Sequence, residues 1–498
     1  MNLATHRNTN QMDHPNTANN WIQSGLWLVL AVTCFQAAYT SVRHPAAGWL
    51  IFGYALGLIR LTDQPNVRRA FYFGLATGFL CYAPQLLFFW RIFNVAAVLL
   101  WLVLAFWVGL FAAIICGSGR RWGKVKTAWL IPLVWTGIEF FRSELYFLRF
   151  SWLNVGYALP FHNFGMYGGG LITFASVTAG ACYFRPGFTQ SPAGRQIILS
   201  LLAILALGFL ALGLTTKPVA GSNHQPPLTL VGIQAEFPLP SILPKLLNQA
   251  LAKNPQADIF VLSEYTLDGP VPEALKNWCR EHSRHLVVGG KDFVGKDNYY
   301  NTAFVVGTNG DIVFQQAKSV PIQFFKDGLP ATGQAVWNSP WGKIGLCICY
   351  DLSYTRVTDE LVRQGAQVII NPTMDVEYWG RQQHELHSRV APTRAAEYGV
   401  PIFRVASSGI SQAITGAGQV VAHTSVGGYG EIFSAQLQLP VRGALPPDRW
   451  FGPVCVSFTG GLLTLLLALH WQEQRDVQKT SAGAGNNKTG APCGTPVS

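Results

Sequence analysis

The sequence predicts a multi-pass α-helical membrane protein with a water-soluble α/β domain inserted before its last membrane span. Three observations predict this class. The 498-residue chain is 49% hydrophobic and only 12% charged, with a mean hydropathy of +0.23, which is too apolar for an ordinary soluble protein. Its apolar residues gather in runs long enough, or nearly long enough, to cross a bilayer core of about 30 Å. A long segment of different composition, 223–440, interrupts the series of runs.

The apolar runs predict about eight transmembrane helices. The second and fifth runs are shorter than the length that a helix needs to cross the bilayer core. A polar stretch, 1–20, precedes the first run, and a tail rich in Gly, Ser and Asn, 472–498, follows the last one; we expect this tail to be disordered and cytoplasmic. Seven spans fall between 21 and 214, and the eighth is separate. The predicted spans are 21–41, 45–59, 70–90, 95–116, 127–141, 161–183, 197–214 and 453–471.

The distribution of charge predicts the orientation. From Lys217 to Arg449 the chain holds 19 Lys and Arg and 19 Asp and Glu, so the formal net charge of +11 belongs to the membrane part. With both termini cytoplasmic, the cytoplasmic segments hold 13 of the 17 remaining basic residues. Because Lys and Arg accumulate in cytoplasmic loops, we expect the α/β domain on the periplasmic or extracellular side of the cell (inner) membrane.

The same charge distribution and the cysteine spacing exclude two other classes of site. The α/β segment has no basic patch interleaved with aromatic residues, which argues against a nucleic-acid partner. The nine cysteines show neither a CxxC pair nor a Cys/His spacing suited to zinc. We therefore expect neither a metal site nor a cofactor.

Short apolar runs alternate with helical patterns over the α/β segment, which predicts an α/β sandwich. Helices are expected at 241–253, with Ser241 as the N-cap, and at 273–282, 357–364 and 383–398. Strands are expected at 228–234, 258–264, 285–291, 301–307, 311–318, 343–349, 366–372, 401–407, 412–423 (as a hairpin) and 431–439.

Three polar residues each close an apolar strand, where a side chain can leave the core and face a cleft. They are Glu264, Lys318 and Cys349. One such residue is more often a solvated strand end. Together they supply a carboxylate to take a thiol proton, a thiol to attack and an ammonium to stabilise an oxyanion, which are the groups that cysteine acyl chemistry requires. We interpret the three as candidate catalytic residues.

The order of these residues, with "YYNTAFVV" before the Lys and "CYD" at the Cys, resembles the nitrilase (carbon-nitrogen hydrolase) superfamily, whose Glu-Lys-Cys triad sits on an αββα sandwich. Together with the eight spans, the segments "RFSWLNVGYAL" (149–159) and "GRQQHELHSRVAPTRAAEYGVPIFRVASSG" (380–409) extend the resemblance to the apolipoprotein N-acyltransferase family. That family inserts a nitrilase-like domain between its seventh and eighth transmembrane helices. The resemblance implies an N-acyltransferase. It would move an acyl chain from a membrane phospholipid, through a cysteine thioester, to the N-terminal amine of a diacylglyceryl-cysteine lipoprotein.

The resemblance also implies roles for individual residues. Cys349 stands at the family's nucleophile, whereas Cys347 is interpreted as packing in mid-strand. Asp351 stands where the family carries Glu, either orienting the nucleophile turn or capping the helix that follows. In "QFFKDGLP" a family Glu is replaced by Lys326 or, with a one-residue shift, by Asp327. The expected substrate-binding residues are Trp152, Tyr157, Tyr350, Asp351 and Lys326. For Trp152 and Tyr157, the alternative role is that of an interfacial aromatic anchor.

Two other functions remain compatible with the sequence. A membrane-bound nitrilase-type amidase would keep the fold and the triad but hydrolyse a carbon-nitrogen bond, with water attacking the thioester. The changed segments after Lys318 and at 371–380 leave this alternative open, since both surround the substrate mouth. A transporter or lipid-binding protein with a degenerate nitrilase domain is the second alternative, although all three triad residue types are present in order. Lipid dependence, an amine requirement and the effect of Cys349→Ala separate the three.

Overall fold

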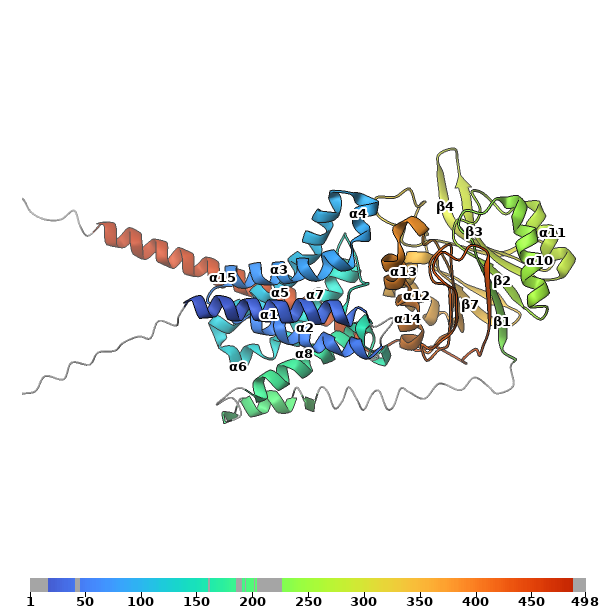
Figure 1. Cartoon of the computed structure of the whole chain (residues 1–498). Helices are drawn as coiled ribbons and strands as arrows, with labels where there is room; N and C mark the ends of the chain where they lie inside the picture. The colour runs from blue at the N-terminus through green and yellow to red at the C-terminus, as the bar shows by residue number, and fades with distance from the viewer. Residues whose placement is uncertain are drawn as a thin grey trace, which may run out of the picture.

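The computed structural model describes residues 17–40, 45–159, 162–184, 190–192, 194–200, 202–203 and 226–486. A helical part and an α/β part lie side by side (Figure 1). The first residues of α1 and the last of α15 lie at the end of the helical part away from the α/β part (Figure 1). The helical part contains α1 (Thr17–Ala38), α2 (Ile51–Leu61), α3 (Val67–Gln85), α4 (Phe88–Phe93), α5 (Ala96–Trp122), α6 (Lys124–Thr127), α7 (Leu130–Phe140), α8 (Met166–Tyr183) and α15 (Asp448–Asn486).

The helical part is consistent with a membrane domain. In the described part of the chain, the helices that are long and apolar enough to cross a membrane are Trp21–Ala38, Ala96–Trp122 and Asp448–Lys479, and Ala46–Leu61 is apolar but shorter. The number of eight spans stays a prediction, and the seventh of them, 197–214, lies for the most part outside the described residues. The prediction of a disordered tail from residue 472 needs correction, because α15 continues to Asn486.

A proline interrupts the third predicted span, 70–90. Helix α3 contains Pro84, which has no backbone N–H to donate to the carbonyl of Leu80. The side-chain amide of Gln36 on α1 donates to that carbonyl instead, at 2.8 Å. Helix α3 ends at Gln85, and the separate short helix α4 follows. The break places α4 at the end of the helical part next to the α/β part (Figure 1).

The α/β part contains two six-stranded sheets packed face to face, in the orders β12-β1-β2-β3-β4-β5 and β11-β10-β9-β8-β7-β6. Apolar side chains from both sheets, such as Val261 and Ile370, form the core between them. Helices α10 (Leu243–Lys253) and α11 (Glu273–His282) cover the outer face of the first sheet. Helices α12 (Thr355–Arg363), α13 (Arg381–Ser388) and α14 (Val390–Tyr398) cover the second. This arrangement confirms the predicted αββα sandwich.

The strands follow the predicted order, with β6 as an addition at the edge of the second sheet. The parallel pairs are β1 with β2, β2 with β3, β7 with β8 and β8 with β9. The strands are β1 (Leu228–Gln234), β2 (Ile259–Leu262), β3 (His285–Val294), β4 (Asn298–Val306), β5 (Ile312–Ala317), β6 (Val336–Ser339), β7 (Gly342–Leu346), β8 (Val368–Thr373), β9 (Ile402–Ala406), β10 (Gln412–Ile414), β11 (Val420–His423) and β12 (Glu431–Leu437).

Two helix predictions need correction. Helix α10 begins at Leu243 after a 3-10 turn over Pro240–Ile242, so Ser241 is not its N-cap. The predicted helix 383–398 is two helices, α13 and α14, with Arg389 between them. Pro392 in the first turn of α14 has no N–H to bond the carbonyl four residues before it, which explains why one continuous helix does not form.

A buried polar seam joins the two parts. Glu397 on α14 accepts hydrogen bonds from the backbone N–H of Met166 at 2.6 Å and from Arg449, at the start of α15, at 2.9 Å. Arg449 also pairs with Asp359 on α12 at 2.8 Å, and all three charged side chains are buried. The seam fixes the α12 to α14 side of the sandwich against the helices (Figure 1).

Candidate active site

The candidate nucleophile, Cys349, lies in a strained turn. Strand β7 ends at Leu346, and a 3-10 turn runs from Cys349 to Ser353. The backbone φ of Cys349 is +50°, a left-handed conformation that residues with a side chain rarely adopt. Such residues persist only where the surrounding structure holds them in place, and they cluster at functional sites. Only 2% of the surface of Cys349 is exposed.

The prediction that the strand 343–349 includes Cys347 and Cys349 is wrong, because β7 ends at Leu346, before both. Cys347 is fully buried in the core. The side-chain amide of Asn371 donates to the Cys347 carbonyl at 3.0 Å and lies 3.5 Å from its Sγ. Cys347 therefore packs in the interior, as expected, whereas Cys349 lines a pocket.

Asp351 holds the turn in place. Its carboxylate accepts hydrogen bonds from the backbone N–H groups of Val320 at 2.7 Å, Ser319 at 3.1 Å and Ile348 at 3.2 Å. These contacts tie the residue before the nucleophile to the segment that follows Lys318. Of the two roles expected for Asp351, the geometry fits orientation of the nucleophile turn. Its side chain does not line the pocket in front of Cys349.

Replacing Asp351 with alanine is expected to destabilise this turn and slow the reaction at Cys349. One buried backbone N–H, that of Ile348, and two partly buried ones, those of Ser319 and Val320, lose their acceptor, and an unsatisfied buried group costs about 1–3 kcal/mol. We expect the thermal unfolding midpoint in detergent to fall by several degrees. The control is Asp297→Ala, since that side chain is exposed in the β3–β4 hairpin. Equal midpoints for the two variants would contradict the orienting role.

Lys318 is fully buried between two carboxylates. Its Nζ lies 2.9 Å from Glu264 Oε1 and 2.7 Å from Asp327 Oδ2. Burial by itself lowers the pKa of Lys318, but the two carboxylates outweigh burial and hold the pKa well above its usual range. Lys318 is therefore a charged ammonium fixed at the ends of strands β2 and β5.

Glu264 reaches the nucleophile turn through the backbone of Met374. Its Oε1 accepts from Lys318 and from the Asn301 amide at 2.6 Å, and its Oε2 accepts from the N–H of Met374 at 2.7 Å. The thiol of Cys349 donates to the carbonyl of the same Met374 at 3.7 Å. Burial raises the pKa of Glu264. Burial, followed by the nearby Glu264, also raises the pKa of the Cys349 thiol well above its usual range.

Thus the structure brings all three predicted residues to one place. The thiol carries its proton in the resting protein, because its pKa is raised, and a base is needed to make it a nucleophile. The arrangement provides a carboxylate and an ammonium beside a protonated thiol. It can therefore perform nucleophilic acyl chemistry.

The second carboxylate at the site is Asp327. Besides Lys318, it contacts the hydroxyl of Tyr265 at 2.8 Å and the backbone N–H of Ile322 at 2.7 Å. The side chain of the preceding Lys326 is exposed at the surface. The alternative alignment, in which Asp327 replaces the family Glu, therefore fits the structure. Lys326 lies outside the buried cluster of Glu264, Lys318 and Asp327.

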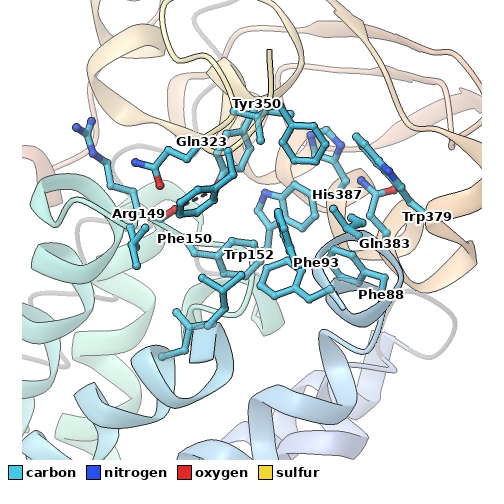
Figure 2. Close-up of a pocket in the computed structure, with 18 of the residues that line it drawn as sticks. Phe88, Phe93, Arg149, Phe150, Trp152, Gln323, Tyr350, Trp379, Gln383 and His387 are labelled. Carbon is cyan, nitrogen blue, oxygen red and sulfur yellow. Dashed lines mark hydrogen bonds between the residues drawn. The ribbon is translucent and has the colours of Figure 1, made fainter. Parts of the chain in front are cut away.

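An apolar pocket opens in front of Cys349. Figure 2 shows aromatic side chains converging on it from both parts of the protein. Helix α4 contributes Phe93, α5 contributes Val103, the loop before α8 contributes Trp152, and the loop after Lys318 contributes Phe325. The rings of Phe93 and Phe325 meet edge to face with centroids 5.8 Å apart. The nucleophile therefore faces a cavity whose walls belong partly to the helical part.

Two of the five predicted substrate-binding residues line this pocket. Trp152 and Tyr350 do, with their rings 5.9 Å apart. Tyr157 is buried in the helical part and is not among the lining residues, and Asp351 lies behind the turn. Lys326 is exposed, as described above. Substrate contact for these five residues stays a prediction.

Sequence reasoning missed the contribution of α4 and of the loop 322–325 to the pocket. A signal was present in the run "LLFFWRIF" (86–93), where aromatic residues follow directly on the helix-breaking Pro84. Aromatic residues at the end of a span are usually interfacial anchors. Their position against a loop more than two hundred residues later is a tertiary contact that no local pattern encodes.

Known proteins match both parts of the chain. Residues 24–182 match the family model described as apolipoprotein N-acyltransferase N-terminal domain, and residues 226–445 match carbon-nitrogen hydrolase. An apolipoprotein N-acyltransferase of Geobacter metallireducens is 24% identical over 79% of this chain and 86% of its own length. One of Rickettsia bellii is 26% identical over 67% of this chain and 72% of its own. A carbon-nitrogen hydrolase structure from Helicobacter pylori aligns with 42% of this chain and 89% of its own, at 19% identity and a TM-score of 0.38.

The α/β sandwich with Cys349 in its strained turn is thus a carbon-nitrogen hydrolase domain, carried here by a membrane protein. The two family models together cover most of the helical part and the sandwich, and the alignment with the Geobacter protein extends over 455 residues. Over both of its parts the chain is therefore similar to apolipoprotein N-acyltransferases.

Proposed function

We propose that this protein transfers an acyl chain from a membrane phospholipid, through a thioester on Cys349, to the N-terminal amine of a diacylglyceryl-cysteine lipoprotein. The observation that carries the proposal is the apolar pocket in front of Cys349, which the helical part helps to build. The relatives' name, apolipoprotein N-acyltransferase, supports the reaction and the class of acceptor.

The pocket suits an acyl chain better than a small polar amide. Its walls are mostly aromatic and aliphatic, with few polar groups at Arg149, Gln323, Gln383 and His387. Each methylene that leaves water for such a site contributes about 0.8 kcal/mol. A chain of many methylenes therefore gains much more from this pocket than the substrate of a soluble amidase would. Because α4 and α5 form one wall, a phospholipid can enter by lateral diffusion in the membrane.

In the acylation half-reaction, Glu264 takes the proton of the Cys349 thiol, and the sulfur attacks the carbonyl carbon of the sn-1 ester. The ammonium of Lys318 stabilises the oxyanion that forms. When the intermediate collapses, the carbon–oxygen ester bond breaks, and the departing alkoxide takes the proton back from Glu264. The products are a lysophospholipid and an acyl thioester on Cys349. In the second half-reaction an amine attacks the thioester, an amide forms and the thiol is regenerated.

The topology we propose has eight transmembrane helices, both termini in the cytoplasm and the α/β part on the periplasmic or extracellular face of the inner membrane. Two observations support it. Basic residues concentrate in the segments that this topology places inside. The first residues of α1 and the last residues of α15 lie at the same end of the helical part, away from the α/β part (Figure 1). The catalytic residues would then act at the outer leaflet.

The proposal is tested with the full chain in detergent micelles. The protein is incubated with a phospholipid carrying an isotope-labelled sn-1 chain and with a synthetic diacylated lipopeptide, and the products are separated by mass spectrometry. We expect the label on the lipopeptide N-terminus and one lysophospholipid for each transfer. Label found only in free fatty acid would indicate a hydrolase. Cleavage of small amides without lipid turnover would favour an amidase, and lipid binding without any turnover a binding protein.

Filling the pocket should affect long acyl chains more than short ones. Val103→Trp adds a large ring to the wall formed by α5. We expect the rate of Cys349 acylation by a palmitoyl phospholipid to fall by at least about 10-fold, since only a few displaced methylenes account for that loss. A butanoyl analogue should lose far less. The adjacent Leu102, 39% exposed on the outer side of the helix, provides the matched control Leu102→Trp, and equal losses for both chain lengths would contradict the pocket's role.

A further inference from the structure

A histidine that the scheme above does not use lines the same pocket as Cys349. His387 on α13 is buried, and its ring stacks on Trp152 with centroids 4.5 Å apart and planes tilted by 17°. Figure 2 shows this ring among the aromatic side chains of the pocket. Its Nε2 has no hydrogen-bond partner among the residues that the structure describes. A buried polar atom without a partner is rare in folded proteins and requires an explanation.

The neighbours of His387 determine which ring nitrogen carries the proton. Its Nδ1 lies 2.7 Å from Asp375 Oδ1, and the other oxygen of Asp375 pairs with Arg404 on β9. Burial raises the pKa of Asp375, but His387 and Arg404 more than offset burial and lower it. Asp375 is therefore a carboxylate, and a carboxylate this close to Nδ1 requires the proton on Nδ1. The lone pair is then on Nε2, at the edge of the ring that is not occupied by Asp375 and can face the pocket.

Burial, more than any charged neighbour, keeps the ring of His387 neutral at physiological pH. Burial lowers the pKa of His387, Asp375 raises it, and Arg404, 3.1 Å from Nδ1, and the nearby Lys318 lower it again. The pKa ends below its ordinary value. Gln383, which also lines the pocket, donates to Asp375 at 2.9 Å and leaves the charge balance unchanged. His387 thus presents a proton-accepting nitrogen to the pocket that contains Cys349.

Glu264 is poorly placed to serve a second substrate. Its Oε1 already accepts from Lys318 and Asn301, and its Oε2 accepts from the N–H of Met374. These contacts aim Glu264 at the nucleophile and away from the pocket, and it is not among the lining residues. The acceptor of the proposed reaction nevertheless arrives as an ammonium, because an α-amine has a pKa of about 8. It cannot attack the thioester until it has lost a proton.

We infer that His387 Nε2 takes this proton and is the general base for the aminolysis step, a role that rests on the proposed function. In this step the ammonium gives one proton to Nε2, and its nitrogen attacks the thioester carbonyl carbon. The carbon–sulfur bond breaks, the sulfur leaves as a thiolate, and the new amide gives its second proton to that thiolate. The imidazolium then releases its proton to water, so each turnover frees one proton. Asp375 positions the ring and stabilises the imidazolium.

The test separates the two half-reactions. His387→Asn keeps an amide that can donate to Asp375 but has no base at the Nε2 position. The acyl-enzyme is first formed with phospholipid alone and quantified by intact mass, and its discharge is then timed at pH 7 with a diacylated lipopeptide. We expect acylation within a few-fold of wild type and discharge slowed by about 100-fold, the usual contribution of a general base. Discharge by hydroxylamine, which is already neutral at pH 7, should match wild type, and discharge by the lipopeptide should recover as the pH is raised.

His387→Gln and His423→Asn complete the experiment. The first places an amide near the Nε2 position and should behave like His387→Asn even if that variant folds poorly. The second replaces an exposed histidine on β11 and should match wild type throughout. Equal slowing with hydroxylamine and lipopeptide would overturn the inference in favour of a purely structural role, and unchanged discharge by the lipopeptide would overturn it as well. If wild type itself formed no acyl-enzyme, the proposed function would fail instead.

Discussion

Cys349→Ala should eliminate the acyl-enzyme and reduce lipid turnover by more than about 10³-fold, because the variant loses the only group proposed to bond to the acyl chain. The measurement is the intact mass of detergent-purified protein after incubation with phospholipid alone. Wild type should gain the mass of one acyl chain, and hydroxylamine should remove it, since a thioester is cleaved by that reagent. The variant should show no gain.

The neighbouring cysteine provides the matched control. Cys347→Ala removes a thiol of the same kind two residues away, from a buried position that packs in the interior. It should keep the acyl adduct, with a loss of stability of no more than about 1–2 kcal/mol for one small buried side chain. An adduct that persists in Cys349→Ala, or that disappears only in Cys347→Ala, would show that the nucleophile is misassigned. A lipid-binding role that survives Cys349→Ala would favour a non-enzymatic protein.

Lys318→Met should be the most destabilising single change at the site. Methionine has nearly the volume of lysine, but it leaves Glu264 and Asp327 buried without the cation that both contact. Removing one partner of a buried ion pair costs about 3–5 kcal/mol, and the loss of an oxyanion-stabilising group slows catalysis by about 10²–10³-fold. We expect a lower thermal unfolding midpoint and slower acylation of Cys349.

The pH dependence of this variant follows from the sign of the pKa change. Burial already raises the pKa of Glu264, and Lys318 opposes that rise. Without Lys318 the folded-state pKa rises further above the unfolded value, so folding is favoured at low pH and this contribution is lost as the pH increases through the folded pKa. The stability deficit should therefore be smaller at pH 5 than at pH 8. The control Lys291→Met breaks an ion pair with the exposed Asp268, worth at most about 1 kcal/mol; an equal deficit in both variants would contradict the buried-pair argument.

The grouping of Glu264, Lys318 and Cys349 could be predicted because each residue follows the end of a strand. Short apolar runs identify β2, β5 and β7, and the polar residue that follows each run is visible in the sequence. The register of the loop after Lys318 could not be predicted, because no periodicity distinguishes Lys326 from Asp327 in an irregular segment. The structure selects Asp327 because its carboxylate satisfies Lys318 together with three other donors.

The pocket and its histidine depend on contacts between distant segments. Phe93 meets Phe325, and Trp152 stacks on His387, across more than two hundred residues of sequence. The sequence placed 383–398 in a helix but gave no reason to single out His387. Its partner Asp375 lies in 371–380, one of the two segments in which the sequence departs from the family.

The buried seam between the two parts determines when during its synthesis the protein can become active. Glu397 and Asp359 belong to the sandwich, whereas Arg449, the cation that they share, belongs to the last helix. A ribosome that has just finished the sandwich has not yet delivered this helix to the membrane, and the two carboxylates then lack the cation that they share. Insertion of the C-terminal helix therefore completes the seam. We expect a chain truncated before Arg449 to unfold more readily than the full chain, because removing one partner of a buried ion pair is destabilising.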